Sequence, residues 1–351
     1  MQDFYKDKKV LITGHTGFKG AWLSQILTKW GANACGYSLD SPTDPNLFEL
    51  LDLNSKMNSI IGDIRDLDKL HNVFEEFKPE IVIHMAAQPL VRESYENPVY
   101  TYETNVMGTV NICECVRQSD SVKSFLNVTT DKVYKNVEKS EGYKEDEKLD
   151  GFDPYSNSKS CSELVTHSYI NSFLKEKNIP TSTARAGNVI GGGDFAKDRI
   201  IPDCFRAFEN KEDIIIRNPY STRPYQHVLE PLGMYLTIAK MQFNNVDYSG
   251  YYNVGPNDED CVETGELVNL FCKYYNEISD ENIKWINKSD NGPHEANFLK
   301  LDNNKIKKTF NWKPTWGIEK AIEKTVEWIN IYLNNGNIIN CVNNQIDEFF
   351  N

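Results

Sequence analysis

The sequence has no apolar run long enough to cross a membrane, and its first residues, MQDFYKDKKVLITG, carry charges where a signal peptide would be apolar. Basic residues are also scarce, with 38 lysines and arginines against 51 aspartates and glutamates. The net charge of -13 disfavours binding to nucleic acid or to anionic lipid. We therefore predict a cytoplasmic protein without nucleic-acid or membrane partners, in which local arginines and backbone amides would hold any anionic ligand.

The eight cysteines lack the spacing of a metal site, because no CxxC pair occurs among them. Several stand within apolar or helical patterns, where cysteine usually serves as a small reduced core residue. The sequence therefore predicts no bound metal and a reducing compartment.

The first half of the chain alternates short apolar runs with amphipathic helical patterns. Predicted strands are residues 9–13, 33–37, 59–61, 80–85, 122–129 and 180–184, and predicted helices are residues 20–30, 67–77, 100–117 and 155–177. Several runs, such as VLI and IVIH, are apolar on both faces, as in strands that helices cover from both sides. The alternation predicts an α/β fold of the Rossmann type, with a doubly wound parallel sheet.

The pattern changes after about residue 187, where loops and short helices replace the alternation. We expect a dinucleotide-binding domain made of residues 1–186 and 227–256. A smaller α/β substrate-binding domain would comprise residues 187–226 and 257–351. The final segment, residues 336–351, is rich in asparagine and weakly patterned, which is typical of a tail or a partner-binding extension.

A glycine-rich turn, GHTGFKG, lies between the first predicted strand and the first predicted helix. Gly14, Gly17 and Gly20 allow a tight turn and a close approach of the backbone to a pyrophosphate. The following helix start offers free N–H groups and partial positive charge to the phosphates. The GxxGxxG spacing differs from the plain GxGxxG of many dehydrogenases, but its place between strand and helix predicts dinucleotide binding.

The adenosine end of this site carries a weaker signal. An acidic residue is expected where the second strand ends, to bind the ribose hydroxyls. Asp40 is the only carboxylate near that point, after Ser38, and no arginine is present to meet a 2′-phosphate. NAD is therefore favoured over NADP. Asp63, after the third strand, either contacts the adenine or caps the next helix.

Tyr155 and Lys159 form a YxxxK pair at the start of a predicted helix. Residues four apart lie on one helix face, so the ammonium would favour the phenolate and lower the pKa of Tyr155. Such a tyrosine can take a proton from a sugar hydroxyl while hydride leaves the same carbon. The preceding strand ends at Thr130, Asp131 and Lys132, and strand ends form the ligand crevice in a parallel sheet. These three residues therefore face the expected ligand.

With these motifs the chain resembles the extended short-chain dehydrogenases/reductases, the NAD-dependent epimerase/dehydratase family, and within them the CDP-glucose 4,6-dehydratases. The stretches that carry the resemblance are TGHTGFKGAWLS (13–24), HMAAQPLVRESYENPVYTYETNVMGT (84–109), TTDKVY (129–134), YSNSK (155–159), ARAGNVIGGGDFAKDRIIPD (184–203), IRNPYSTRPYQHVLEPL (216–232), PHEANFLKLD (293–302) and NWKPTW (311–316). They extend over nearly the whole chain.

The resemblance implies an internal redox reaction of deoxysugar biosynthesis. Hydride leaves C4 of the hexose for NAD, water is lost across C5 and C6, and the hydride returns to C6. Tyr155 would be the base at C4, Thr130 would hydrogen-bond the C4 oxygen, and Asp131 would be the acid for the C6 hydroxyl. Lys132 stands where the wider dehydratase group commonly has glutamate, and would either take the C5 proton or orient the sugar.

The resemblance also implies the remaining site residues. Those expected to bind the cofactor are Gly14, Thr16, Gly17, Phe18, Lys19, Gly20, Ser38, Asp63, Ile64, Ala86, Ala87, Gln88, Asn105, Thr129, Tyr155, Lys159 and Ala186. Those expected to bind the nucleotide sugar are Ser94, Thr130, Asn188, Arg199, Arg217, Arg223 and His294. The arginines suit a diphosphate because a guanidinium meets phosphate oxygens in pairs.

Two other functions use the same scaffold. A dehydratase for another nucleotide sugar, or a 4-epimerase, would keep Tyr155 and Lys159, but an epimerase has no use for Asp131 and Lys132 as an acid and base. A catalytically silent dinucleotide sensor would not need the YxxxK pair. Helices 100–117 and 155–177 have apolar faces. The resemblance implies that they pair across a dimer axis, so we expect a homodimer.

Overall fold

The computed structural model describes residues 1–279, 282–288 and 298–351. Its centre is a seven-stranded parallel sheet in the order β11-β6-β5-β4-β1-β2-β3. The strands are β1 (Lys9–Thr13), β2 (Asn33–Ser38), β3 (Asn58–Ile61), β4 (Ile81–His84), β5 (Ser124–Thr130), β6 (Thr181–Ala186) and β11 (Tyr251–Val254). The order reverses between β1 and β4, so the predicted doubly wound Rossmann-type fold is confirmed, with the ligand crevice expected at that reversal.

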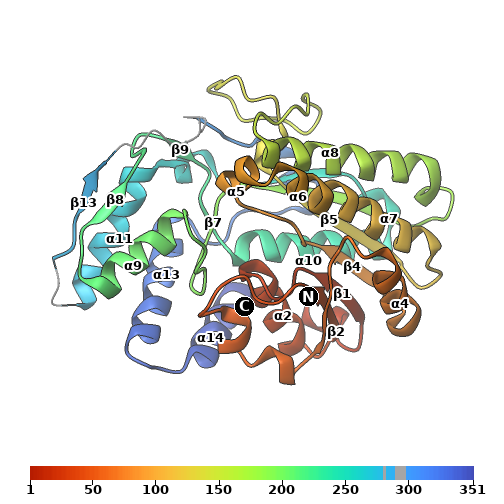
Figure 1. The fold of residues 1–351 in the computed structure, drawn as a ribbon, viewed down its shortest axis with the longest axis horizontal. Helices are drawn as coiled ribbons and strands as arrows, with labels where there is room; N and C mark the ends of the chain where they lie inside the picture. The colour runs from red at the N-terminus through yellow and green to blue at the C-terminus, as the bar shows by residue number, and fades with distance from the viewer. Residues whose placement is uncertain (280–281, 289–297) are drawn as a thin grey trace.

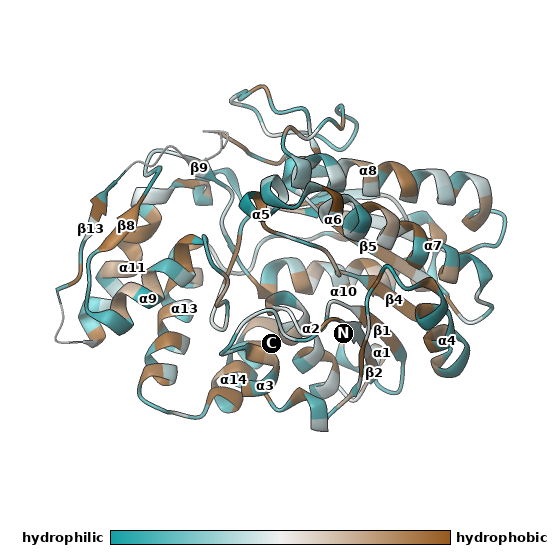
Figure 2. Cartoon of the chain, in the orientation of Figure 1, coloured by the Kyte–Doolittle hydropathy of each residue, from teal (hydrophilic) through white to brown (hydrophobic). Residues whose placement is uncertain are grey.

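Helices cover both faces of the sheet, with α7 and α8 on one side and α2 and α10 on the other (Figure 1). The four helices are α2 (Phe18–Lys29), α7 (Gly108–Gln118), α8 (Pro154–Tyr169) and α10 (Leu229–Asn244), and a fifth, α4 (Leu67–Phe77), packs beside α7. Alternate strand residues supply two buried clusters: Leu11 and Val82 face α4 and α7, whereas Ile12 and Ile83 belong to the cluster that includes α2 and α10. Figure 2 shows the apolar character of β1 and β4 that this double burial requires.

A smaller lobe lies beside the carboxyl end of the sheet, at the left in Figure 1. It contains α9 (Ile200–Asn210), α11 (Thr264–Ile278) and α13 (Ile318–Leu333). Among the described residues it also has three two-stranded sheets, which pair β7 (Val189–Ile190) with β10 (Gln226–His227), β9 (Thr222–Arg223) with β12 (Val262–Glu263), and β8 (Ile214–Ile216) with β13 (Trp285–Asn287). Helix α12 (Asn304–Phe310) packs instead against β11 of the large sheet. The chain enters this lobe after β6 and returns to the large sheet through α10 and β11.

The asparagine-rich C-terminal segment is helix α14 (Ile338–Phe350), so its interpretation as a tail or extension was wrong. Ile338, Val342 and Ile346 are buried, and Phe350 lies against Trp30 of the first lobe, with ring centroids 4.8 Å apart. The apolar residues recur every three or four positions, but the asparagines between them on the outer face hid this periodicity.

Two predicted helices are interrupted by a wider turn. The predicted helix 100–117 is α6 (Pro98–Tyr102) and α7, separated by a π-helical segment, Glu103–Met107. The predicted helix 155–177 is α8 followed by a second π-helical segment, Ile170–Leu174. Such turns insert a residue without ending the helix and often lie at functional sites. Amphipathic spacing does not reveal them.

A buried carboxylate fastens the loop that carries Trp316 to the large lobe. Glu230 of α10 accepts hydrogen bonds through Oε1 from the backbone N–H groups of Thr315 (2.7 Å) and Trp316 (2.6 Å). Its Oε2 is buried without a hydrogen-bond partner among the described residues. Burial, with a smaller contribution from the charge of Asp260, raises the pKa of Glu230 to about 7, although the backbone hydrogen bonds from Trp316 and Thr315 lower it.

Replacing Glu230 with glutamine is expected to stabilise the protein at pH 8 by on the order of 1–3 kcal/mol. The pKa of Glu230 is higher in the folded protein than in the unfolded chain, so between these two values the folded protein binds more protons than the unfolded chain. The stability of the wild type therefore falls as the pH rises from about 4.5 to 7. Glutamine keeps an acceptor oxygen and carries no charge. Urea unfolding should show that the variant has a larger free energy of unfolding than the wild type at pH 8, and that this difference falls to less than half at pH 5. An equal difference at both pH values would mean that packing, and not ionisation, is responsible.

None of the helices in residues 1–279, 282–288 and 298–351 combines the length and apolar character needed to span a membrane. All eight cysteines lie in the described chain as free thiols, six of them buried, as their apolar surroundings in the sequence predicted.

Candidate active site

The turn between β1 and α2 has the geometry of a dinucleotide cradle. Gly14 has a φ of +78°, and a Cβ there would lie 2.9 Å from the backbone nitrogen of Ala86. A Cβ on Gly20 would lie 2.0 Å from the carbonyl oxygen of Gly14, so both positions exclude a side chain. Gly17 caps α2 without a side-chain hydrogen bond, which leaves the first N–H groups of the helix for phosphate oxygens. The turn therefore fits the pyrophosphate of NAD.

Hydroxyl groups, rather than a carboxylate, lie where β2 ends beside this turn. The Thr16 and Ser38 hydroxyls are 2.5 Å apart, and the Thr16 hydroxyl also donates to the carbonyl of Leu39. Asp40 is exposed beyond them. Binding of the adenosine ribose by Ser38 stays a prediction. The hydroxyl groups around Ser38 could both donate and accept hydrogen bonds with the ribose.

Asp63 is not the cap of helix α4, so that interpretation was wrong: Asp66 is the cap and accepts from the N–H of Lys69 at 3.0 Å. Asp63 pairs instead with Arg65 at 2.7 Å, and hydrogen bonding with this guanidinium lowers the pKa of the carboxyl. The adjacent backbone is fixed at the same edge of the sheet, because Asn111 donates to the carbonyl of Ile64 at 3.0 Å. Contact of Asp63 and Ile64 with adenine stays a prediction.

Asn105 holds the loop after β4 that was predicted to line the cofactor. Its Oδ1 accepts from the N–H of Gln88 at 2.8 Å, and its Nδ2 donates to the carbonyl of Gln88 and to the hydroxyl of Ser158 on α8. Asn105 lies in the first π-helical segment, which turns the side chain toward this loop. The Thr13 hydroxyl accepts from the N–H of Ala86 at 3.1 Å, so the loop carrying Ala86, Ala87 and Gln88 is fixed from two sides.

Tyr155 lies in the first turn of α8 and borders the main pocket. Asp153 caps the helix by accepting from the N–H of Ser156 at 2.9 Å, and Pro154 occupies the first helical position. Burial raises the pKa of Tyr155 to about 12, although hydrogen bonding with Thr130 and the charge of Arg199 lower it. In the protein by itself burial therefore outweighs the depression of the tyrosine pKa that was expected.

Lys159 lies behind Tyr155, buried, with its ammonium donating to the carbonyl of Val128 at 3.2 Å. Burial and the nearby Lys19 lower the pKa of Lys159 to about 7, and Glu163 opposes them. Lys19 borders the pocket from α2, and burial together with Arg199 lowers its pKa to about 8. Among the nearby positive charges, that of Arg199 lowers the pKa of Tyr155 and so favours a developing phenolate.

The carboxyl of Asp131 is aimed at the pocket. Its Oδ1 accepts from the Thr130 hydroxyl at 2.9 Å, and its Oδ2 is buried without a hydrogen-bond partner among the described residues. A Cβ added to the pocket residue Gly187 would lie 3.2 Å from that Oδ2. Burial raises the pKa of Asp131, while Lys132 and Arg223 oppose the shift. A carboxyl whose protonated form is favoured in this way suits a proton donor.

A cavity of about 800 Å³ opens between the two lobes beside these groups. Of the predicted residues, those that line it are Phe18, Lys19, Thr129, Thr130, Asp131, Lys132, Tyr155, Ala186, Asn188, Arg199, Arg217 and Arg223. Ser94 is buried within α5 (Val91–Glu96), where its hydroxyl donates to the carbonyl of Val91, and it is not among the lining residues. His294 lies outside the described residues.

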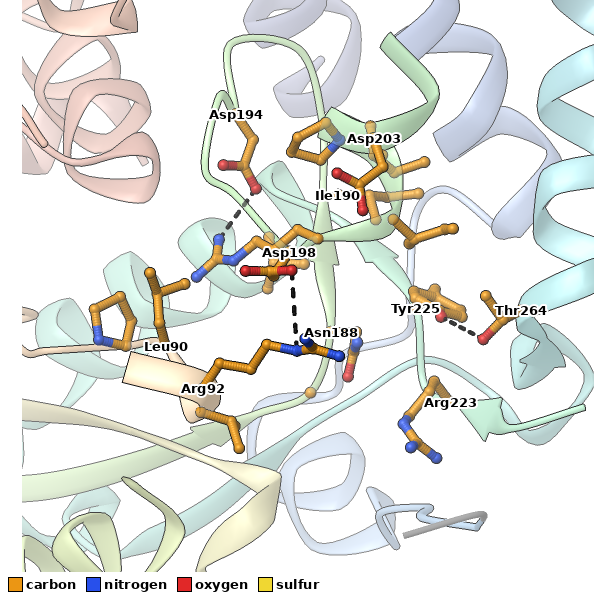
Figure 3. Close-up of a pocket in the computed structure, with 18 of the residues that line it drawn as sticks. Leu90, Arg92, Asn188, Ile190, Asp194, Asp198, Asp203, Arg223, Tyr225 and Thr264 are labelled. Atoms are coloured by element: carbon orange, nitrogen blue, oxygen red, sulfur yellow. Dashed lines mark hydrogen bonds and ion pairs between the residues drawn. The ribbon is translucent and has the colours of Figure 1, made fainter. Parts of the chain in front are cut away.

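Sequence reasoning missed several residues of this pocket, including Arg92, Asp194, Asp198, Tyr225 and Thr264. Figure 3 shows them around the cavity with the predicted Asn188 and Arg223. The Tyr225 hydroxyl lies 3.0 Å from that of Thr264, which joins two segments of the smaller lobe. Arg92 had a usable signal, since it stands in the stretch that follows β4 at the carboxyl edge of the sheet.

Three comparisons place the chain among known proteins. The model of the family described as GDP-mannose 4,6 dehydratase matches residues 11–325. A CDP-glucose 4,6-dehydratase of Salmonella typhimurium is 47% identical over 99% of this chain and 98% of its own length. A crystal structure of dTDP-glucose 4,6-dehydratase from Bacillus anthracis in complex with NAD has a TM-score of 0.76, with 20% identity and coverage of 94% of this chain and 98% of that chain. At that identity the last comparison supports the fold alone.

Proposed function

The chain belongs to the GDP-mannose 4,6-dehydratase family, and from this membership we propose that it is an NAD-dependent hydro-lyase that converts CDP-glucose to CDP-4-dehydro-6-deoxyglucose. The observation that carries the choice of substrate is the 47% identity, over 99% of the chain, to the Salmonella enzyme named for CDP-glucose. The pocket supports the reaction type, because it brings Tyr155, Thr130 and Asp131 together between the lobes.

Each step of the reaction has a group in reach of the pocket. Tyr155 takes the proton of the C4 hydroxyl, and the Thr130 hydroxyl hydrogen-bonds the same oxygen. The C4 ketone acidifies the C5 proton, and a base in the pocket, for which neutral Lys132 is the candidate, takes that proton as the C6 hydroxyl leaves. Asp131 donates a proton to the leaving hydroxyl, which departs as water, and its raised pKa suits that task.

Lys132 borders the same pocket and is half-buried there. Its ammonium is available either to orient the hexose or, after losing its proton, to remove the proton from C5. An ammonium that keeps its proton would stabilise the negative charge that develops on the C4 oxygen when the C5 proton leaves.

When bound, NAD would supply the hydride acceptor for C4 and the hydride donor for C6 of the same hexose. The turn of Gly14, Gly17 and Gly20 would hold its pyrophosphate by backbone N–H groups. The loop of Ala86 to Gln88, braced by Asn105, and the strand end at Thr129 lie along the path toward Tyr155.

Incubation with CDP-glucose and NAD should give a product lighter by the mass of one water, with no net reduction of NAD. Mass spectrometry over CDP-, UDP-, dTDP- and GDP-hexoses tests both substrate and reaction. Conversion of another nucleotide sugar with loss of water would overturn the CDP assignment, and an isomer of unchanged mass would identify an epimerase.

We further propose that the enzyme is a cytoplasmic homodimer. Apolar side chains remain exposed on α8 and on the two π-helical segments, which precede α7 and follow α8; among them are Met107, Leu164 and Phe173, at 51%, 56% and 42% exposure. A second copy of this face would cover them. Light scattering after size exclusion should give twice the mass of the chain. Cysteine thiols that are all unpaired fit a reducing compartment.

A further inference from the structure

Two arginines from opposite lobes meet on one carboxylate oxygen at the pocket. Arg92 is in α5, which follows β4, whereas Arg217 follows β8 in the smaller lobe. The Arg92 Nε lies 3.9 Å and the Arg217 Nη1 lies 2.8 Å from Oδ1 of Asp198. Figure 3 shows Arg92 directed at Asp198 across the cavity. Neither the motifs nor the comparisons assign a role to Arg92 or Asp198.

The carboxylate of Asp198, which pairs with both guanidinium groups, lies where an anionic ligand could replace it. The side chain of Asp198 is 45% exposed, against 34% for Arg92 and 31% for Arg217. Ion pairs this exposed contribute little to folding stability, so breaking them costs little. Asp198 also has a φ of +59°, in the left-handed region that is uncommon for residues other than glycine. A loop conformation of this kind is consistent with a role in ligand binding rather than in packing.

All three residues line the cavity that holds Tyr155 and Asp131. The proposed substrate carries two phosphate groups between its sugar and its nucleoside. Guanidinium groups bind phosphate and carboxylate oxygens through the same planar fork, and a diphosphate offers more charge and more acceptors than one carboxylate. A diphosphate is therefore the stronger partner for two arginines that converge on one point.

We propose that Arg92 is a further substrate-binding residue, which forms with Arg217 a clamp for the diphosphate, and that Asp198 is the counter-ion which the diphosphate replaces. The inference rests on the proposed function insofar as the substrate is a nucleoside diphosphate sugar. Because the two arginines belong to different lobes, substrate binding then draws both lobes onto one ligand, with Asp198 turned away from them.

The test compares inhibition by CDP and by cytidine, which has no phosphate, in Arg92→Gln and Asp198→Asn. Arg92→Gln should raise the inhibition constant of CDP about tenfold, as expected for a lost charge-assisted hydrogen bond. The inhibition constant of cytidine should rise less than about twofold, because cytidine has no phosphate for Arg92 to bind. Asp198→Asn should tighten CDP several-fold, since the competing charge is gone while asparagine tolerates the same left-handed conformation. Thermal unfolding and NAD binding report whether each variant is folded.

Arg206→Gln is the matched control. Arg206 belongs to the same chain of ion pairs through Asp203 but is not among the residues that line the cavity. Its variant should bind CDP as the wild type does. An unchanged CDP constant in Arg92→Gln, or weaker CDP binding in Asp198→Asn, would overturn the clamp. If UDP, dTDP or GDP inhibits the wild type more strongly than CDP does, the proposed substrate is wrong, and the same comparison with that nucleotide tests the clamp. If none of the four nucleotides inhibits the wild type, the clamp is refuted.

Discussion

Tyr155→Phe is expected to lower turnover of the nucleotide sugar by roughly 10²-fold or more, because general acid–base catalysis contributes about that factor. The hydroxyl is the only group removed, and the ring continues to fill its place beside Thr130 and Arg199. Binding of NAD should remain close to normal, since the glycine turn and the loop braced by Asn105 do not depend on this hydroxyl. Steady-state kinetics and a titration of NAD measure both effects.

Tyr169→Phe serves as the control for this prediction. Tyr169 ends the same helix, α8, and its hydroxyl reaches Glu114 at 3.4 Å, away from the pocket. Its variant should leave turnover essentially unchanged, because the hydroxyl that it removes contacts neither the pocket nor a residue that lines it. Near-normal turnover in Tyr155→Phe would show that another group takes the C4 proton.

Asp131→Asn should separate the oxidation from the loss of water. The amide fills the same volume and still accepts from Thr130, but it cannot donate a proton to the leaving hydroxyl as a carboxylic acid does. Dehydration should slow by roughly 10²-fold, whereas oxidation at C4 should persist. Rapid mixing should then show reduced nicotinamide accumulating by its near-ultraviolet absorbance, with little product lighter by one water.

The substitution also distinguishes the two reaction types that share this scaffold. An epimerase needs no acid at C6, so its turnover would survive Asp131→Asn. Asp150→Asn removes a partly exposed carboxylate that pairs with Lys148 at 2.9 Å and should leave every step unchanged. If the Asp131 variant loses water at the normal rate, the proton comes from another group in the pocket.

Local patterns were sufficient to predict the centre of the molecule. The runs that form β1 and β4 are apolar up to Thr13 and His84 at their carboxyl ends, after the partly buried Lys9, and Gly14 and Gly20 of the first turn have steric reasons that the structure confirms. Thr130, Asp131 and Tyr155 could be placed together because the carboxyl ends of parallel strands share one edge.

Features that depend on tertiary contacts were not predictable in the same way. The π-helical segment at Asn105 leaves helical spacing nearly intact, and helix α14 hides its apolar stripe among asparagines. The shift of the Tyr155 pKa required knowledge of its burial, which the YxxxK spacing does not contain. Asp198 lies in the stretch 184–203 that carries the resemblance, but its meeting with Arg92 and Arg217 arises only when the two lobes come together.

The lobe that contains the large sheet cannot complete its packing until helix α14, at the end of the chain, has been synthesised. Phe350 covers Trp30, and Asp347 pairs with Lys29 at 3.1 Å, although about 320 residues separate these partners in the chain. At ~5–20 residues per second, translation takes about 20 to 60 s to supply that cover. Until then Trp30 lacks the cover of Phe350, so we expect a chain that ends before α14 to be less stable than the full chain.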